Sequence, residues 1–183
     1  MESATIINEL IEYTKEHLNR VQVFKEMPLE QLNHRNQPES WSILECLEHL
    51  NLYGDFYLPE IKRRIAASRH QNNRQFKSGR LGNYFVNLIK PKENLNKMKT
   101  GKSVNPIGST LDAQVIDKFI QQQEQMLVLL NDARRVNLSK TKTSISLTKL
   151  VKLRLGDTLR FVIYHNERHI LQAEKVLEGV IVI

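Results

Sequence analysis

The sequence has very little cysteine and no long apolar run, and both absences exclude whole classes of protein. Cys46 is the single cysteine of the 183 residues, so no disulfide can form within the chain, and a reducing, cytoplasmic setting is expected. The longest internal apolar run, Met126 to Leu130, falls far short of the ~20 residues that cross a bilayer. The first residues, Met1 to Ser3, lack the positive-then-apolar pattern of a secretion signal. A disulfide-built secreted protein and a membrane-spanning one are therefore not expected.

The composition indicates one globular domain covering residues 1–183. Hydrophobic residues make up 40% and charged residues 26% of the chain, which is ordinary for a globular protein. The net charge of +7 is concentrated in residues 62–102, which hold twelve Lys or Arg and one acid, Glu93. Such a block suits either nucleic-acid binding or a solvated connection. We favour the connection, because no nucleic-acid motif is present and the aromatics Phe76, Tyr84 and Phe85 are too few for a stacking platform.

Four segments carry the spacing of amphipathic helices, which predicts an all-α fold, a four-helix bundle. Connectors are expected at 27–40, at 69–108 (with a short helical piece near Tyr84 to Ile89) and at 137–154. Pro59 is expected to kink or break the second helix. The predicted helices are residues 3–21, a second from the capping box Ser42 to Glu45, a third capped by Ser109 or Thr110, and a last that starts near Asp157 and stops near Gly179, a good C-terminal cap.

Three histidines lie at the edges of apolar helical arcs. His165 and His169 are four residues apart, so they lie one turn above the other and both rings can point at one ion. His49 has the same position on the second helix. A pair of partly buried or surface histidines remains the alternative explanation of this pattern. His17, on the inner face of the first helix, is interpreted as a packed core residue.

Two segments resemble the DinB-like superfamily, which includes damage-inducible DinB proteins and bacillithiol S-transferases. They are Trp41-Ser42 followed by Glu45-Cys46-Leu47-Glu48-His49-Leu50, and the run from Asp157 through His165 and His169 to Gln172. The resemblance implies an up-down-down-up bundle with a long crossover between helices 2 and 3. It also implies that His49, His165 and His169 are the ligands of one divalent metal ion.

The resemblance implies a metal-dependent hydrolase or thiol S-transferase that activates water or a low-molecular-weight thiol for attack on an electrophile. Three imidazoles leave an open position on the ion, and they suit zinc, nickel or iron alike. No catalytic residue beyond the ligands is assigned. Glu45 is expected to stay in its cap, and Cys46 is expected to be a buried, inert thiol. A metal binder without turnover remains an alternative, and a nucleic-acid binder using residues 62–102 is a weaker one.

Two expectations concern surfaces. Tyr164 and Leu171 stand seven apart on the face of the last helix that also carries its charges, which predicts a helix-to-helix contact in a homodimer. Dimers also occur among DinB-like proteins. The basic segment 62–102 is expected to lie over the open end of the bundle and to draw an anionic thiol toward the metal.

Overall fold

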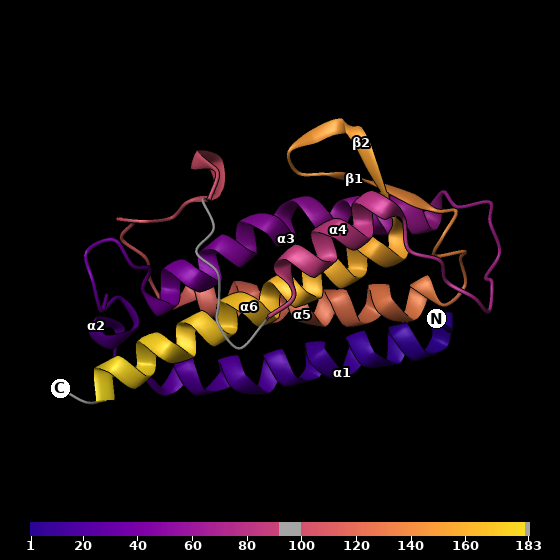
Figure 1. Cartoon of the computed structure of the whole chain (residues 1–183). Coiled ribbons are helices and arrows are strands. Elements are labelled where there is room, and N and C mark those ends of the chain that lie inside the picture. The colour runs from indigo at the N-terminus through magenta and orange to yellow at the C-terminus, as the bar shows by residue number, and fades with distance from the viewer. Residues whose placement is uncertain (92–99, 182–183) are drawn as a thin grey trace.

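Long helices dominate the computed structural model, which describes residues 1–91 and 100–181. Four helices of twenty residues or more in this described part lie side by side (Figure 1). This mostly helical architecture confirms the all-α part of the prediction. The long helices are α1 (Ser3–Gln22), α3 (Ile43–Ala66), α5 (Gln114–Ala133) and α6 (Leu155–Ile181).

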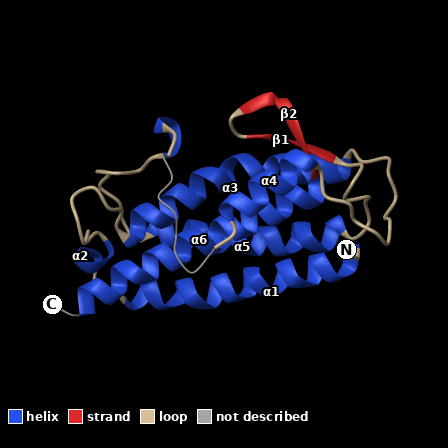
Figure 2. Cartoon of the chain, in the orientation of Figure 1, coloured by secondary structure: helices blue, strands red, loops and turns tan. Residues whose placement is uncertain are grey.

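Shorter elements join and cover the long helices (Figure 2). They are η1 (Val23–Glu26) and α2 (Leu29–Leu32) between α1 and α3; α4 (Arg80–Ile89) and η2 (Lys102–Val104) between α3 and α5; and β1 (Lys142–Ile145) with β2 (Thr148–Arg154) before α6. No helix in the described ranges combines the length and apolar character needed to cross a bilayer.

Each long helix packs mainly against two others, because α1 and α3 each lie against both α5 and α6. The four helices therefore form a ring of neighbours in the order α1–α5–α3–α6. By the colour ramp, α1 and α6 run in one direction and α3 and α5 in the other (Figure 1). Backbone hydrogen bonds bring the matching ends together: the Ser3 amide at the start of α1 donates to the Arg74 carbonyl at 2.8 Å, and the Asn137 amide after α5 donates to the His70 carbonyl at 2.9 Å. Both acceptors follow α3, so one end of the molecule gathers the start of α1 and the ends of α3 and α5.

The start of α3 is the predicted capping box. Ser42 Oγ accepts from the Glu45 amide at 3.2 Å, and the Glu45 carboxylate accepts from the Ser42 amide at 2.8 Å. Pro59 does not break the helix, which continues to Ala66. Its later turns stay helical because Ile61 and Ile65 are buried in the core.

Two predicted helix ends are wrong. The third long helix begins at Gln114, with no side-chain cap from Ser109 or Thr110. Asp112 instead accepts from the Gln114 amide at 2.9 Å. The last helix begins at Leu155 and runs through Gly179 to Ile181. Gly179 lies close to the loop before α3, since a Cβ there would come within 2.4 Å of the end of the Asn36 side chain.

Residues 142–154 form an antiparallel hairpin, which the prediction of a plain connector missed. The polar residues Thr143 and Ser144 of β1 are buried, so the segment lacks the alternation of apolar and polar residues by which a strand is recognised. Their polar groups have partners inside the fold. Thr143 Oγ1 lies 2.6 Å from Thr158 Oγ1 of α6, and the Ser144 amide donates to Glu60 of α3 at 2.8 Å. The hairpin is thereby fixed to both helices.

The long connection between α3 and α5 contains α4, longer than the short helical piece that was predicted. The buried carboxylate of Asp157 in α6 holds its start, accepting from the Gly79 amide at 2.8 Å and from the Ser78 hydroxyl. Gly82 allows close approach, since a Cβ there would lie 2.4 Å from an Asp157 oxygen. As a result α4 packs along α6.

The face of α6 that carries Tyr164 is not an outer face. Tyr164 is 3% exposed, and its hydroxyl donates to Glu9 of α1 at 2.8 Å. Arg20 of α1 donates to Glu167 and Glu174 of α6 at 2.6–2.7 Å. This face meets α1 within the chain, so Tyr164 gives no support to the predicted subunit contact, although the homodimer itself stays a prediction.

Candidate metal centre

Three histidines from two helices converge in the interior. His49 comes from α3, and His165 and His169 come from successive turns of α6; they are 2%, 4% and 8% exposed. Each offers one ring nitrogen, and these three atoms all lie within 4.8 Å of one another. The structure thus brings together the three residues that the sequence singled out.

The nitrogen spacing fits a shared ion. His49 Nε2 and His165 Nε2 are 3.2 Å apart. Two imidazole nitrogens at ~2.05 Å from one ion, separated by a tetrahedral angle, would stand about 3.3 Å apart. The pair therefore needs almost no movement to bind the same ion.

Two of the histidines have a hydrogen-bond partner that orients the ring. His49 Nδ1 lies 2.6 Å from the carbonyl oxygen of Val104, and a carbonyl can only accept, so Nδ1 carries the proton. His169 Nδ1 lies in the same way 3.0 Å from Gln172 Oε1. Donation from Nδ1 leaves Nε2 with its lone pair free, and metal-binding histidines typically donate their other ring N–H to a carbonyl or carboxylate in this way.

The surroundings keep all three rings neutral at neutral pH. Burial lowers the pKa of His49 to about 4, against a partial opposing effect of the Val104 carbonyl. Burial, reinforced by the charge of His49, lowers the pKa of His169 to about 3. Burial and the neighbouring histidines hold the pKa of His165 well below its usual value. Neutral imidazoles are the form that binds metal ions.

Aromatic side chains enclose the histidines. The Trp41 ring centroid lies 4.7 Å from that of His49 and 5.5 Å from that of His169. Tyr53 lies 4.4 Å from His165, and Phe161 stacks on His165 at 5.8 Å with an interplanar angle of 7°. Enclosure of this kind excludes bulk water and restricts the rings to few orientations.

The segment 104–108 provides part of the site, and sequence reasoning missed it. Besides the Val104 carbonyl, Asn105 Oδ1 accepts from Trp41 Nε1 at 3.1 Å, and the Gly108 amide donates to Glu45 at 2.6 Å. Glu45 keeps its predicted cap role and also accepts from Arg35 at 2.6–2.8 Å. Burial alone would raise the pKa of Glu45, but these hydrogen bonds hold it below its usual value. One carboxylate thus joins the start of α3 to the segment that orients His49.

The other sequence candidates lie outside this cluster. His17 is fully buried, as predicted, and its Nε2 lies 3.0 Å from Glu167. Cys46 is also fully buried, as predicted, and burial raises the pKa of its thiol. Neither residue belongs to the group of potential metal ligands.

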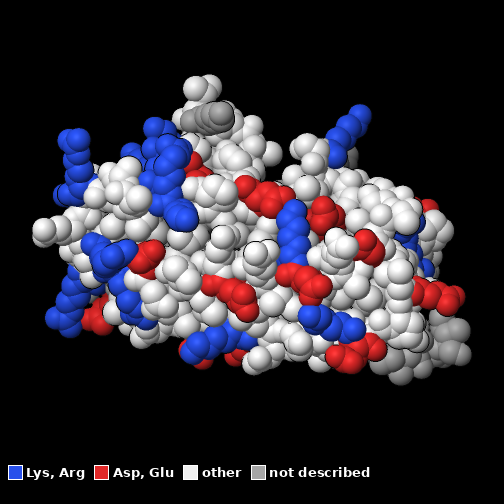
Figure 3. Space-filling model, turned by 180° about the vertical axis from the view of Figure 1, so that it is seen from behind, with Lys and Arg blue, Asp and Glu red and all other residues white. Residues whose placement is uncertain are grey.

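The first part of the basic segment 62–102 does not cover the site. Arg63 and Arg64 pair with Glu60, and Arg64 is fifteen residues from His49 along α3, or ~22 Å at 1.5 Å per residue. That distance exceeds the ~8 Å over which exposed charges act at physiological salt. Residues 92–99 of the segment lie outside the described residues. The face in Figure 3 has Lys and Arg gathered toward the end where α3 and α5 end, and a mixture of both signs along its middle.

The chain matches the family model of the DinB superfamily over residues 13–173, which includes all three histidines. Neither a search of curated proteins nor a search of solved structures gave a match. The family match covers far more than half of the sequence, and it agrees with the buried three-histidine group described above. This chain is therefore a member of the DinB superfamily.

Proposed function

We propose that His49, His165 and His169 hold one divalent metal ion and that the protein is a metal-dependent transferase that moves a low-molecular-weight thiol onto an electrophile. The observation that carries the proposal is the convergence of three buried ring nitrogens within 4.8 Å. Their neutral state and the orientation of His49 and His169 by hydrogen bonds support it. Zinc, nickel and iron all suit a site of three imidazoles.

The donor set favours thiol transfer over hydrolysis. A bound ion lowers the pKa of a thiol until the thiolate, the reactive nucleophile, dominates. Hydrolysis also uses a bound water, but metal hydrolases commonly add a carboxylate as ligand or general base. Among the described residues, no Asp or Glu oxygen joins the histidines in the 4.8 Å group. The nearby Glu45 is committed to Ser42, Arg35 and Gly108.

The chain's own residues perform three tasks in this proposal. The three histidines bind the metal ion. The Val104 carbonyl orients His49 and the Gln172 side chain orients His169, so that the lone pair of Nε2 is free in each ring. Trp41, Tyr53 and Phe161, whose rings contact the histidines, limit the access of water. In a site poor in water, the charge of a thiolate is less screened and more reactive.

We further propose that the fold is the up-down-down-up four-helix bundle implied by the resemblance. The ring of neighbours α1–α5–α3–α6 and the shared direction of α3 and α5 support this topology. Two consecutive helices that run in the same direction need a long crossover, and the connection of residues 67–113 supplies it. In this assignment, α4 and the β1–β2 hairpin are additions that pack on the outside of α3 and α6.

The test is elemental analysis of the purified protein, followed by thiol-transfer assays with the metal found. Cysteine, glutathione and bacillithiol serve as thiols, with 1-chloro-2,4-dinitrobenzene as electrophile. His165→Ala removes one ligand and should lower metal affinity roughly 100-fold, since ~10–16 kcal/mol of binding shared among four ligands gives about 3 kcal/mol each. His70→Ala, at an exposed histidine far along the chain from the cluster, is the matched control and should change neither metal content nor rate.

The outcomes separate the alternatives. Stoichiometric metal that is lost in His165→Ala, together with transfer by wild type only, supports the enzyme. Metal bound in the same histidine-dependent way but without transfer to any thiol would leave a metal binder without turnover. Absence of any bound divalent ion after loading with zinc, nickel or iron would overturn the proposal. Nucleic-acid binding at physiological salt that is indifferent to His165→Ala would favour the weaker alternative instead.

A further inference from the structure

A small apolar pocket lies directly beside the histidine cluster. Its walls include Tyr53 and Phe161, the two aromatic residues that flank His165 at centroid distances of 4.4 and 5.8 Å. Tyr53 also lies 4.9 Å from His49. The pocket and the candidate metal centre therefore share two side chains, and a molecule in the pocket would contact the rings that flank His165.

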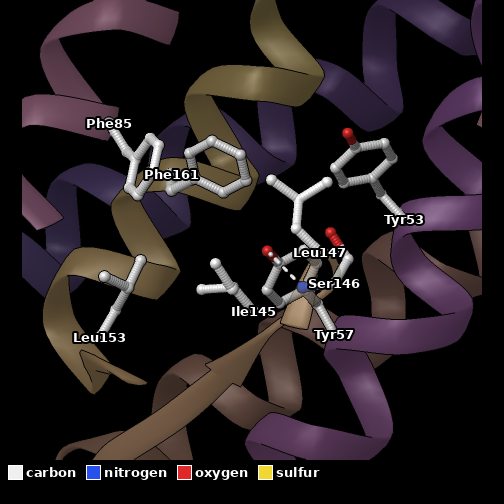
Figure 4. A pocket seen from close by; sticks show the side chains of 8 residues that line it. All are labelled: Tyr53, Tyr57, Phe85, Ile145, Ser146, Leu147, Leu153 and Phe161. Atoms are coloured by element: carbon white, nitrogen blue, oxygen red, sulfur yellow. Dashed lines mark hydrogen bonds between the residues drawn. The ribbon is translucent and has the colours of Figure 1, made fainter. Parts of the chain in front are cut away.

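Five structural elements contribute to the pocket, and the hairpin contributes most (Figure 4). Phe85 and Phe161 meet edge to face at 6.4 Å on one side, and Tyr53 and Tyr57 line the other. The hairpin lies between these two sides, fixed through the Ser146 amide, which donates to the Tyr57 hydroxyl at 3.3 Å. The complete lining is Tyr53 and Tyr57 of α3, Phe85 of α4, Ile145, Ser146 and Leu147 of β1 and its turn, Leu153 of β2, and Phe161 of α6.

The lining selects a neutral, apolar ligand. It contains aromatic and aliphatic side chains, two tyrosine hydroxyls and one serine, and it has no charged side chain. One of the hydroxyls, that of Tyr57, is already engaged by Ser146. A charged thiol would lose its hydration here without gaining an ion pair, whereas a flat apolar group would contact ring faces and edges on two sides. The space of about 320 Å³ includes its open mouth, so it leaves room for one ring at most.

We infer that this pocket is the acceptor subsite and that the electrophile is a neutral compound with a single-ring aromatic body. The inference rests on the proposed function, because it names the partner of the thiol in that reaction. The thiolate sulfur forms a bond to the electrophilic carbon of the ring compound. The bond from that carbon to its leaving group, such as a halide, breaks; the leaving group departs with the electron pair, and the proton of the thiol passes to solvent. The pocket would hold the ring against Tyr53 and Phe161, the two side chains that flank His165.

The exposed turn of the hairpin provides a matched pair of variants. Leu147 lines the pocket although it is 79% exposed, so Leu147→Asp places a charge at the mouth without disturbing the core. Leu150, in the same hairpin, is 93% exposed and does not line the pocket, so Leu150→Asp is the control. On α4, Phe85→Ala and Leu88→Ala form a second pair, since Phe85 lines the pocket and Leu88, 41% exposed, does not.

The experiment measures binding of 1,3-dinitrobenzene, a ring without a leaving group, by isothermal titration calorimetry with and without zinc. Because the probe cannot react, its binding is independent of turnover. Leu147→Asp should weaken binding about tenfold, since a charge would have to lose water next to the ring. Phe85→Ala should weaken it roughly five- to tenfold through lost ring contacts. Leu150→Asp and Leu88→Ala should stay within twofold of wild type.

The results for the pocket and for the enzyme are separable. Saturable binding that follows this variant pattern, without transfer of any thiol, would support the pocket and contradict the proposed function. Transfer to a small polar electrophile such as iodoacetamide, with no binding of the ring probe, would leave the proposed function in place and overturn the pocket. Equal losses in Leu147→Asp and Leu150→Asp would also overturn it, because the effect would then follow hairpin charge and not the lining.

Discussion

Replacing Glu45 by glutamine should destabilise the protein and weaken its metal centre together, because one buried carboxylate connects the two. Glu45 accepts from the Ser42 and Gly108 amides and from Arg35. The cap with Ser42 contributes about 1 kcal/mol to the free energy of unfolding, and the hydrogen bond from the Gly108 amide to the carboxylate contributes about 1.5–3 kcal/mol. The ion pair with Arg35 contributes only about 0.5 kcal/mol, because Arg35 is 30% exposed. Glutamine keeps one acceptor oxygen, so we expect a loss of about 2–3 kcal/mol in the free energy of unfolding.

The assay is urea denaturation across pH, with Glu48→Gln as control on the same helix. The pKa of Glu45 is lowered in the folded protein, so its contribution is complete above the usual carboxylate value of 4.5 and is lost as pH falls through the lowered pKa. The difference between wild type and Glu45→Gln should therefore shrink in acid. Zinc affinity should fall about tenfold, because release of Gly108 loosens the Val104 carbonyl that orients His49. A stability change below about 0.5 kcal/mol at pH 7 would refute this reasoning.

Three further results are expected. Burial would raise the pKa of Glu60, but its hydrogen bonds with the Ser144 amide, Arg64 and Arg63 lower that pKa to about 2. Protection of the Ser144 amide from hydrogen exchange should therefore persist above pH 4.5 and be lost as pH falls toward 2, and unchanged protection at pH 2 would contradict this prediction. The buried Cys46 thiol should react with Ellman's reagent only at the rate of unfolding, and rapid reaction of the native protein would show the burial to be wrong. Sedimentation at tens of micromolar should reveal a homodimer, and a monomer throughout that range would remove this expectation.

Helical periodicity located the long helices because each buries a continuous apolar stripe, as α1 does with Ile7, Leu10 and Val21. It failed on α6, whose surface is covered on more than one side by α1, α3 and α4. A single apolar arc assigns the remaining face to solvent, and so it misplaced Tyr164. The hairpin was missed for a related reason, since Thr143 is buried through a hydrogen bond to Thr158 and gives no hydrophobic signal.

The three histidines could be predicted because ligands need particular side chains at particular spacings. The groups that orient these histidines could not be predicted in the same way. The partner of His49 is the backbone carbonyl of Val104, and every residue carries a carbonyl, so its identity leaves no trace in the sequence. The pocket beside His165 arises where Tyr53 of α3, Phe85 of α4 and Leu153 of β2 meet, and only the folded chain shows which residues those are.

The placement of the donors determines when a metal ion can enter. His49 is separated from His165 by 116 positions along the chain, and His169 follows four residues later. During translation, the three histidines can meet only after α6 has left the ribosome and packed on α3. A zinc finger, whose ligands are close in sequence, uses its ion to drive folding. For the proposed metal site, hydrophobic burial would assemble the helices first, with three uncharged imidazoles in the interior, and an ion would bind only after the helices have packed.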